Sequence, residues 1–387
     1  MRSTRWRAAC LPSALLIGLF WLVASQPVSA AWIGEHAARI YREDPRPAGD
    51  LPAGISTSQD LIVVPTSPRR RLSRRAQRRL QRRGIQVLPE GSSALVGLQA
   101  PVPPHSGLPI DHRGLPYGTG DNFSRLNLHL PGGCREGRLP LVVWVPGTDW
   151  SDGSRDECPL VWLTSRGFAV ASISYHPSQA ATFPAQRDDC RMAITRIAED
   201  AAVWGIDPSR VAVVGRAAGG HLAALVGLDE QTTESPTDDT PQAAFRVASI
   251  CGISMISHLP TLGPDHDRAN SAASRLIGGP LPELREAALA ASPLRYASAG
   301  DPPTLLIHAR STTIPASQSE RLHATLQAAD VESTLVLTDE EPELTPSSQT
   351  GQLLLTFLRR TLTSEVDSVI VRENAAEEPG LTGSNRS

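Results

Sequence analysis

The chain has 387 residues, long enough to bury one large core of about 250 residues together with extensions. Its formal net charge of −3 points to no class of partner as a whole, but every basic residue is arginine and many of them lie near the N-terminus. Beyond residues 8–24, no stretch is apolar and long enough to span a membrane, which excludes a polytopic membrane protein.

Residues 1–30 have the pattern of an export signal. Arg2, Arg5 and Arg7 precede the apolar run 8–24, and Val28-Ser29-Ala30 provides the small residues of a cleavage site. The sequence therefore predicts export to the periplasm, the cell envelope or the medium. If the signal is not cleaved, residues 8–24 would anchor the chain in a membrane.

Residues 31–120 form an extension rich in Pro, Gly, Ser and Arg, with one small ordered candidate at 61–88. Leu61–Val64 and residues 85–88 are strand-like. Between them, Ser67 as N-cap, Pro68 at the first helical position and Gly84 past the end delimit a helix. These signals predict a small β-α-β unit.

The predicted helix carries a dense cationic face. Two interpretations stay open, namely a solvated surface helix or a contact for an anionic envelope component, because like charges at this density repel one another unless they are neutralised. No aromatic residue lies among the arginines, and the chain is predicted to be exported, so both features argue against nucleic acid as a partner. The arginines of this face include Arg69, Arg70, Arg74, Arg75, Arg78, Arg79, Arg82 and Arg83.

From residue 121 to 362 strand-like and helix-like segments alternate, which favours a doubly wound, mostly parallel α/β sheet. The tail 363–387 is acidic and then rich in Gly, Asn and Ser, a composition typical of disorder. The predicted strands are 126–130, 140–145, 168–175, 211–214, 247–251, 304–308 and 334–338. The predicted helices are 159–166, 187–204, 220–226, 317–328 and 351–362.

The segment RVAVVGRAAGGHLAALVG (Arg210–Gly227) predicts a strand, a sharp turn and an apolar helix. This is the context of a nucleophile elbow, whose pattern is G-x-S-x-G. Here the central residue is Ala217, and a methyl group cannot attack a carbonyl carbon.

Taken together, the motifs from Tyr117 to Leu362 resemble the α/β-hydrolase esterases of the hormone-sensitive-lipase-like and feruloyl-esterase-like (BD-FAE) group. The resemblance implies the α/β-hydrolase fold and a carboxylic-ester hydrolase ancestry, whereas function has to be argued from the site. The motifs are PLVVWVPGTDWSDGS (140–154), RGFAVASISY (166–175), FPAQRDDC (183–190), GIDPSRVAVVGRAAGGHLAAL (205–225), ASPLRYASAGDPPTLLIH (291–308) and SQSERLHATLQAADVESTLV (317–336).

The resemblance also predicts where catalytic residues should stand, and there this chain departs from the family. In the family pattern G-x-S-A-G-G-H the serine is replaced here by Ala217, which Ala218 follows as in the family. In the pattern H-G-D-x-D-x-x-V-P the position of the catalytic acid is occupied by Thr312. The G-x-G-H turn that supplies the base is replaced by an acidic run, in which Glu343 is the best match. No catalytic position is intact.

The oxyanion segment H-G-G-G-W of the family is Pro146-Gly147-Thr148-Asp149-Trp150 in this chain. A carboxylate at Asp149 opposes a developing oxyanion. Gly147, Thr148, Asp149, Trp150 and Ala218 are therefore predicted to line a ligand pocket that was once the oxyanion region.

Other reactive side chains lie near predicted strand ends, and hydrogen bonding or packing is the favoured role for each of them. They are His176, His221, His308, Ser254 and Cys251. After signal removal, Cys134, Cys158, Cys190 and Cys251 permit two disulfides in three possible pairings, or buried free thiols. No spacing matches a metal site, and no cofactor is predicted.

Three hypotheses follow. The first is an exported pseudoenzyme that binds or scaffolds without hydrolysis and keeps a pocket for a small ester, acyl or glycan ligand. The second is an active carboxylic-ester hydrolase with relocated catalytic residues. The third is a structural module whose pocket has filled in.

Overall fold

The computed structural model describes residues 61–64, 86–87, 107–118, 121–133, 137–147, 149–151, 154–229 and 245–362. The chain divides into two units, Met1–Asp44 and Pro45–Ser387, and every described residue belongs to the second. The predicted signal at 1–30, the arginine-rich helix, Cys134, Thr148 and the tail 363–387 lie outside the described residues, so the expectations for them stay predictions.

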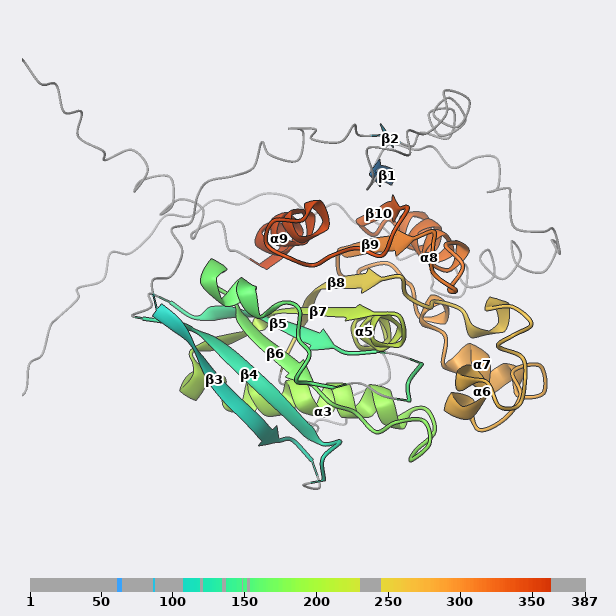
Figure 1. The fold of residues 1–387 in the computed structure, drawn as a ribbon, viewed down its shortest axis with the longest axis horizontal. Coiled ribbons are helices and arrows are strands. Elements are labelled where there is room, and N and C mark those ends of the chain that lie inside the picture. Colours follow the sequence, from blue (N-terminus) through green and yellow to red (C-terminus); the bar gives the residue numbers. More distant parts are fainter. Residues whose placement is uncertain are drawn as a thin grey trace, which may run out of the picture. The chain divides into compact units, whose positions relative to one another are not determined.

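The core of the protein is one mixed sheet of ten strands in the order β2-β1-β10-β9-β8-β7-β5-β6-β4-β3 (Figure 1). All neighbours run parallel except the β3–β4 and β4–β6 pairs, which are antiparallel. The strands are β1 (Leu61–Val64), β2 (Gln86–Val87), β3 (Gly107–Pro116), β4 (Arg125–Gly132), β5 (Leu139–Val145), β6 (Ala169–Ile173), β7 (Ile206–Arg216), β8 (Val247–Ile253), β9 (Thr304–Ala309) and β10 (Ser333–Thr338).

Helices cover both faces of this sheet, as the predicted doubly wound fold requires. They are η2 (Val161–Arg166), α3 (Ala185–Glu199), α4 (Ala201–Trp204), α5 (Ala218–Leu228), η4 (Leu259–Thr261), α6 (Ala272–Ile277), α7 (Arg285–Ala290), η5 (Pro293–Arg295), α8 (Ser317–Ala328) and α9 (Gln349–Leu362), where η denotes a 3₁₀ helix. The fold class is therefore as expected from the sequence.

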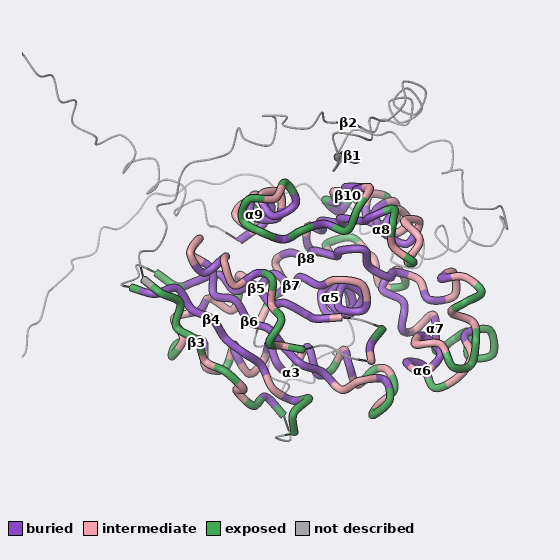
Figure 2. The backbone as a smooth tube through the Cα atoms, viewed as in Figure 1, coloured by how far each residue is buried: buried purple, intermediate pink, exposed green. Residues whose placement is uncertain are grey.

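Successive strand residues point to opposite faces, and this alternation divides the core into two layers. In β5, Val143 and Val145 pack with residues of α3, α5 and α8, whereas Val142 and Trp144 pack with residues of η2 and α9. Because the central strands are covered on both sides, they read as continuous apolar runs in the sequence. Figure 2 shows them buried, with exposed residues gathered on β3 and on the outer sides of helices.

The sheet extends beyond the 121–362 range expected for the hydrolase-like part. β3 precedes residue 121 and pairs antiparallel with β4. The strands predicted at 61–88 are present as β1 and β2, and β1 pairs in parallel with β10, so that Leu61 lies opposite Leu335. Both strands thus continue the same sheet, while the helix predicted between them falls among the residues that are not described.

A buried ion pair joins α3 to the end of α5. Arg187 Nη1 lies 2.6 Å from Asp229 Oδ2, and the Asp229 side chain has no exposed surface. Arg191 also contacts this carboxylate, at 3.9 Å. The pair fixes two helices that lie on the same face of the sheet.

Arg187→Met should lower the free energy of unfolding by about 2 kcal/mol, because a buried carboxylate that loses its main partner keeps its desolvation cost. Arg191 retains part of the compensation, and adding Asp229→Asn should recover part of the loss. The control is Arg268→Met, which removes an exposed pair with Asp265 (2.8 Å) and should change stability by less than about 0.5 kcal/mol. Urea unfolding measures all three, and equal effects of Arg187→Met and Arg268→Met would contradict the prediction.

No helix in the part of the chain that the structure describes is both long enough and apolar enough to cross a membrane.

Candidate functional site

The strand–turn–helix predicted at Ala217 is present and strained. β7 turns into α5 at Ala217, whose φ of 48° and ψ of −115° lie outside the regions that residues other than glycine prefer. The Ala217 N–H donates to the Ile253 carbonyl at 2.8 Å, and its own carbonyl accepts from the His221 N–H at 3.0 Å. This is the backbone of a nucleophile elbow, with a methyl group where the reactive hydroxyl would stand.

Three glycines allow this turn to lie directly on the neighbouring backbone. A Cβ on Gly219 would stand 2.1 Å from the Val145 carbonyl oxygen, and one on Gly215 would stand 2.2 Å from the Gly219 carbonyl oxygen. A Cβ on Gly147 would meet the Gly219 nitrogen at 2.1 Å. The architecture of the elbow is therefore intact, and it brings the predicted oxyanion segment against the start of α5.

The predicted oxyanion segment follows β5 with two consecutive residues at positive φ, Asp149 (51°) and Trp150 (52°). Asp149 is exposed, whereas Trp150 is buried and its Nε1 donates to His221 Nδ1 at 3.1 Å. Ala218 begins α5 and is also buried. Of the predicted pocket residues, the structure thus brings Gly147, Trp150 and Ala218 together around the elbow.

Thr312 stands in the loop after β9, where the family acid is expected. Its Oγ1 lies 3.0 Å from the carbonyl oxygens of both Ala309 and Ile314, so the hydroxyl is used within its own loop. A hydroxyl at this position carries no negative charge with which to orient an imidazole.

The acidic turn after β10 is held by two arginines, one at the end of β7 and one directly after β9. Arg216, directly before Ala217, lies 3.2 Å from Glu341 and donates to the Pro342 carbonyl at 2.9 Å. Arg310 lies 3.5 Å from Asp339. Ion pairs therefore connect the three loops that would carry a catalytic triad.

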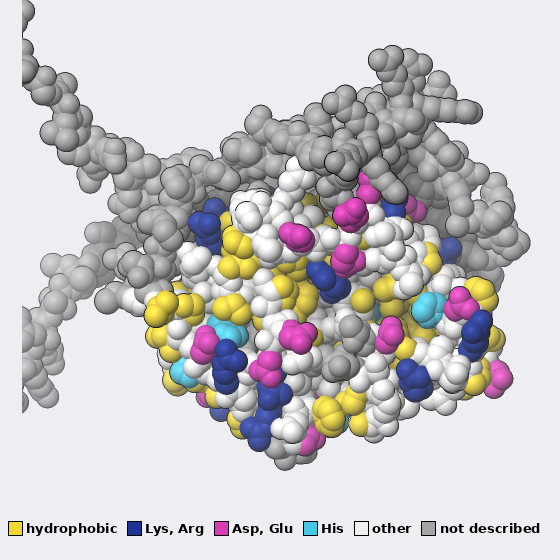
Figure 3. Space-filling model, viewed as in Figure 1, with side chains coloured by type: hydrophobic (Ala, Val, Ile, Leu, Met, Phe, Trp, Pro, Cys, Tyr) yellow, Lys and Arg dark blue, Asp and Glu magenta, His cyan; other side chains and the backbone are white. Residues whose placement is uncertain are grey.

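Glu343, at the position matched to the general base, is exposed. Its backbone carbonyl accepts from Ser348 Oγ at 2.6 Å and from Thr350 Oγ1. On the face drawn in Figure 3, acidic and basic side chains are intermixed and neither sign is segregated.

His221 in α5 and His308 in β9 are buried, and both ring nitrogens of each histidine have hydrogen-bond partners. The Trp150 indole N–H can only donate, so His221 Nδ1 is an acceptor and its Nε2–H donates to the Ala291 carbonyl at 2.6 Å. His308 Nε2 donates to the Ile314 carbonyl at 3.0 Å, and its Nδ1 lies 2.7 Å from Ser319 Oγ. Burial lowers the pKa of His221 to about 4 and also lowers that of His308. Both histidines have the hydrogen-bonding role that the sequence favours.

The other candidate nucleophiles are also used structurally. Ser254 is 2% exposed, and its Oγ accepts the Ala309 N–H at 3.2 Å. Cys251 is fully buried inside β8, and burial raises the pKa of its thiol far above the usual value. The three described cysteines, Cys158, Cys190 and Cys251, are all free thiols, which removes the pairings among them.

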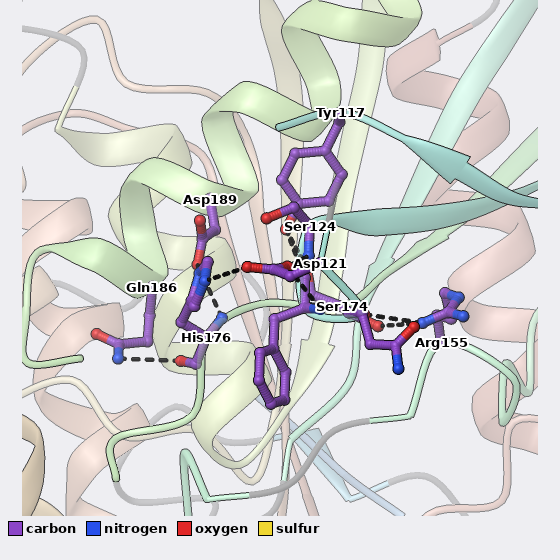
Figure 4. A network of polar contacts seen from close by, with 10 residues as sticks. Tyr117, Asp121, Ser124, Arg155, Ser174, His176, Gln186 and Asp189 are labelled. Atoms are coloured by element: carbon purple, nitrogen blue, oxygen red, sulfur yellow. Dashed lines mark hydrogen bonds and ion pairs between the residues drawn. The ribbon is translucent and has the colours of Figure 1, made fainter. Parts of the chain in front are cut away.

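His176 lies in a network of polar side chains at the end of β6 (Figure 4). Its Nδ1 is 2.8 Å from Asp189 Oδ2, and its Nε2 is 3.0 Å from Asp121 Oδ2. The sequence singled out His176 but neither carboxylate. An acidic residue on the buried side of a predicted amphipathic helix was the available signal for Asp189, whereas Asp121 lies in a loop and gave none.

Among the residues placed by the structure, no group of three or more His, Cys, Asp or Glu side chains is arranged to hold a metal ion.

The sheet, the elbow and the loop positions define the class of the protein as a carboxylesterase-like α/β-hydrolase fold. Residues 126–326 match the BD-FAE family model, and this chain belongs to that family.

Relatives and solved structures agree with this assignment. The chain is 28% identical over 247 residues to esterase LipQ of Mycobacterium tuberculosis (61% of this chain and 58% of that protein). It is 27% identical over 270 residues to the isoprenylcysteine alpha-carbonyl methylesterase ICME of Arabidopsis thaliana (67% and 61%). The matches thus span about three fifths of these two relatives. Esterase B of Lactobacillus rhamnosis shares the fold with a TM-score of 0.57 at 20% identity, covering 72% of this chain and 90% of that one.

Proposed function

We propose that this protein is an exported pseudoenzyme of the BD-FAE family, which binds a small ester, acyl or glycan ligand or serves as a scaffold without hydrolysing it. The observation that carries the proposal is Ala217, a methyl group held in the strained turn that presents a nucleophile in active relatives. Acyl transfer through a covalent intermediate needs a nucleophile, a base within hydrogen-bond reach and a partner that orients the base.

The surroundings of Ala217 support the same conclusion. Thr312 and Glu343 offer a hydroxyl bound within its own loop and an exposed carboxylate in place of an acid and a base. The Arg216–Glu341 and Arg310–Asp339 ion pairs lie between the same three loops, so electrostatic contacts stand where a triad would connect them. A ligand role is favoured because the backbone of the elbow is retained beside the predicted pocket, with Gly147 packed so closely on Gly219 that a Cβ would stand 2.1 Å from the Gly219 nitrogen.

The alternative is an active ester hydrolase with relocated catalytic residues. Two described histidines pair with carboxylates, His129 with Asp111 at 2.7 Å and His176 with Asp189 at 2.8 Å, as a general base requires. His176 Nε2, however, faces a second carboxylate, Asp121, and not a hydroxyl or thiol. Its use as a base would require Asp121 to move away.

Hydrolysis of p-nitrophenyl acetate and butyrate by the purified chain separates these functions. We expect the rate to equal that of a protein-free blank, and we expect no labelling by a fluorophosphonate probe. Ala217→Ser should remain at the blank rate, because the base and the acid are also absent. His176→Gln tests the alternative. If His176 is a relocated general base, the wild type should hydrolyse these esters and the His176→Gln variant should not. Wild-type turnover that the fluorophosphonate abolishes would reject the pseudoenzyme.

Ligand binding is tested separately from catalysis. We expect acetylated xylo-oligosaccharides or short-chain acyl esters to raise the melting temperature of the wild type, because a ligand that binds only the folded state stabilises it. Asp149→Asn, a change at the exposed residue of the predicted pocket, should reduce this shift. Leu108→Ala, a change at an 89% exposed side chain on β3, should preserve it. No shift with any of these compounds would favour the structural module over the binding protein.

A further inference from the structure

His176 is held between two carboxylates that come from different parts of the fold (Figure 4). Asp189 belongs to α3 and Asp121 to the loop between β3 and β4, and their oxygens lie 2.8 Å and 3.0 Å from the two ring nitrogens. Ionised carboxylates can only accept hydrogen bonds. Burial raises the pKa of the Asp189 carboxyl above its usual 3.8. While both carboxylates are ionised, both ring nitrogens must carry protons, and the ring is then an imidazolium cation.

We propose that Asp121, His176 and Asp189 form a proton-operated clamp, which holds the Asp121 carboxylate against the β6–α3 loop while the ring is protonated and releases that carboxylate when the ring loses a proton. A neutral imidazole has a single N–H, so one of the two carboxylates would then face a nitrogen lone pair. That contact is repulsive, and one carboxylate has to leave.

The structure determines which carboxylate leaves. The Asp189 side chain is 5% exposed, and its Oδ2 also accepts the backbone N–H of His176 at 2.8 Å. The Asp121 side chain is 41% exposed and belongs to a loop. Asp121 can therefore move into water more easily than Asp189 can.

Other groups of the same network define what the clamp holds. From the end of β3, the Tyr117 hydroxyl lies 2.6 Å from the Ser174 carbonyl. Arg155 Nη1 donates to Ser174 Oγ and to the Asn122 carbonyl, both at 3.1 Å, and adds a second positive charge to this cluster. The Phe123 ring packs on the His176 ring with centroids 5.5 Å apart. None of these contacts depends on the imidazole proton, so the release is confined to the Asp121 side.

The sign of the pH dependence follows from the same contacts. Burial lowers the pKa of His176, but the hydrogen bonds and charges of Asp189 and Asp121 outweigh it, and the pKa lies above the usual 6.5. The clamp is therefore complete below the pKa of a free histidine and is lost as pH rises through the higher pKa of the folded state. Each pKa unit of difference corresponds to a tenfold change in the closure equilibrium.

The clamp borders the candidate site. Ser178 lies on the same loop as His176, and its backbone N–H donates to the Trp150 carbonyl at 2.7 Å. Release of Asp121 would free one support of the loop that holds the Trp150 segment. This consequence is independent of whether the site hydrolyses a substrate.

The experiment combines an NMR titration of the imidazoles with hydrogen exchange of the full chain between pH 5.5 and 9. Asp121 Oδ1 accepts the N–H groups of Phe123 and Ser124, at 2.9 Å and 2.7 Å, so these amides report on the loop. We expect His176 to titrate above 6.5. After correction for intrinsic exchange, protection of the two amides should fall as pH passes the pKa of His176, by about tenfold for each unit by which that pKa exceeds 6.5.

Asp121→Asn keeps the acceptor oxygen but removes the charge, so it should lower the pKa of His176 and flatten the pH dependence of protection. Asp111→Asn removes the charge from a different histidine–carboxylate pair, that of His129, and should change neither quantity. A pKa of His176 at or below 6.5, or protection of Phe123 and Ser124 that is constant with pH in the wild type, would overturn the proposal.

Discussion

Gly219→Ala should prevent stable folding, with a loss of at least about 3 kcal/mol of unfolding free energy. The new Cβ would stand 2.1 Å from the Val145 carbonyl oxygen and 2.8 Å from that of Pro146. Both are backbone atoms at the end of β5, and they cannot rotate away as a side chain can. The variant should show a strongly reduced urea midpoint or accumulate as insoluble protein.

Gly227→Ala in the same helix is the matched control. Its Cβ would stand 2.6 Å from Ile250 Cδ1 and 2.7 Å from Ile250 Cγ1, which are side-chain atoms and can give way more than a backbone carbonyl can. Alanine also favours the helix by up to about 1 kcal/mol over glycine, so the loss of stability should be clearly smaller than that of Gly219→Ala. If the two variants were equally stable, the close packing of elbow and β5 would not be a requirement of the fold.

Acidification should unfold the protein steeply between pH 6.5 and 4. Burial is the main cause that lowers the pKa of His221, His258 and His323 to about 4 in the folded state. Their pKa in the unfolded chain is about 6.5, so the unfolded state binds up to three more protons in this interval. Stability is therefore complete above pH 6.5 and falls with pH, by up to about 4 kcal/mol per unit.

Urea unfolding at pH 7.5, 6 and 5 measures this slope. His323→Gln should reduce it by roughly one third, because Gln does not titrate and can still contact Ser333, whose Oγ lies 2.9 Å from His323 Nδ1. His266→Gln replaces a partly exposed histidine and should leave the slope unchanged. A stability that is constant from pH 7.5 to 5 would contradict the prediction.

The pattern of apolar residues predicted most strands and helices of the α/β sheet, because this sheet is covered by helices on both faces. The helix predicted at 317–328 has the same bounds as α8, and the closing helix predicted at 351–362 begins two residues earlier, at Gln349. β3 was missed because GLPIDHRGLP is an exposed edge strand that contains Pro and Gly and has no apolar alternation. The predicted helix at 159–166 is a 3₁₀ helix that begins at Val161 and is terminated by Gly167 in the left-handed conformation.

Comparison with the family motifs predicted where the elbow and the triad positions lie, but not which side chains contact one another there. The turn at Ala217 could be predicted because its glycines and apolar flanks are local in sequence. The pairing of Arg216 with Glu341 could not, because Arg216 ends β7 and Glu341 follows β10, two strands that β8 and β9 separate in the sheet, so that only the conformation of the turn after β10 brings the residues together. The same reason hid Asp121 from the sequence, although His176 was already a candidate.

The pairing of β1 with β10 changes how the N-terminal region should be regarded. A parallel strand at the border of a sheet presents unpaired N–H and C=O groups, which are a template for another chain. β1 occupies this position along Leu335–Thr338 of β10. Residues 61–64 therefore protect the edge of β10 and are not a dispensable linker. A form of the protein that begins after them would leave the backbone groups of β10 unpaired on that side, and we expect it to aggregate through this edge.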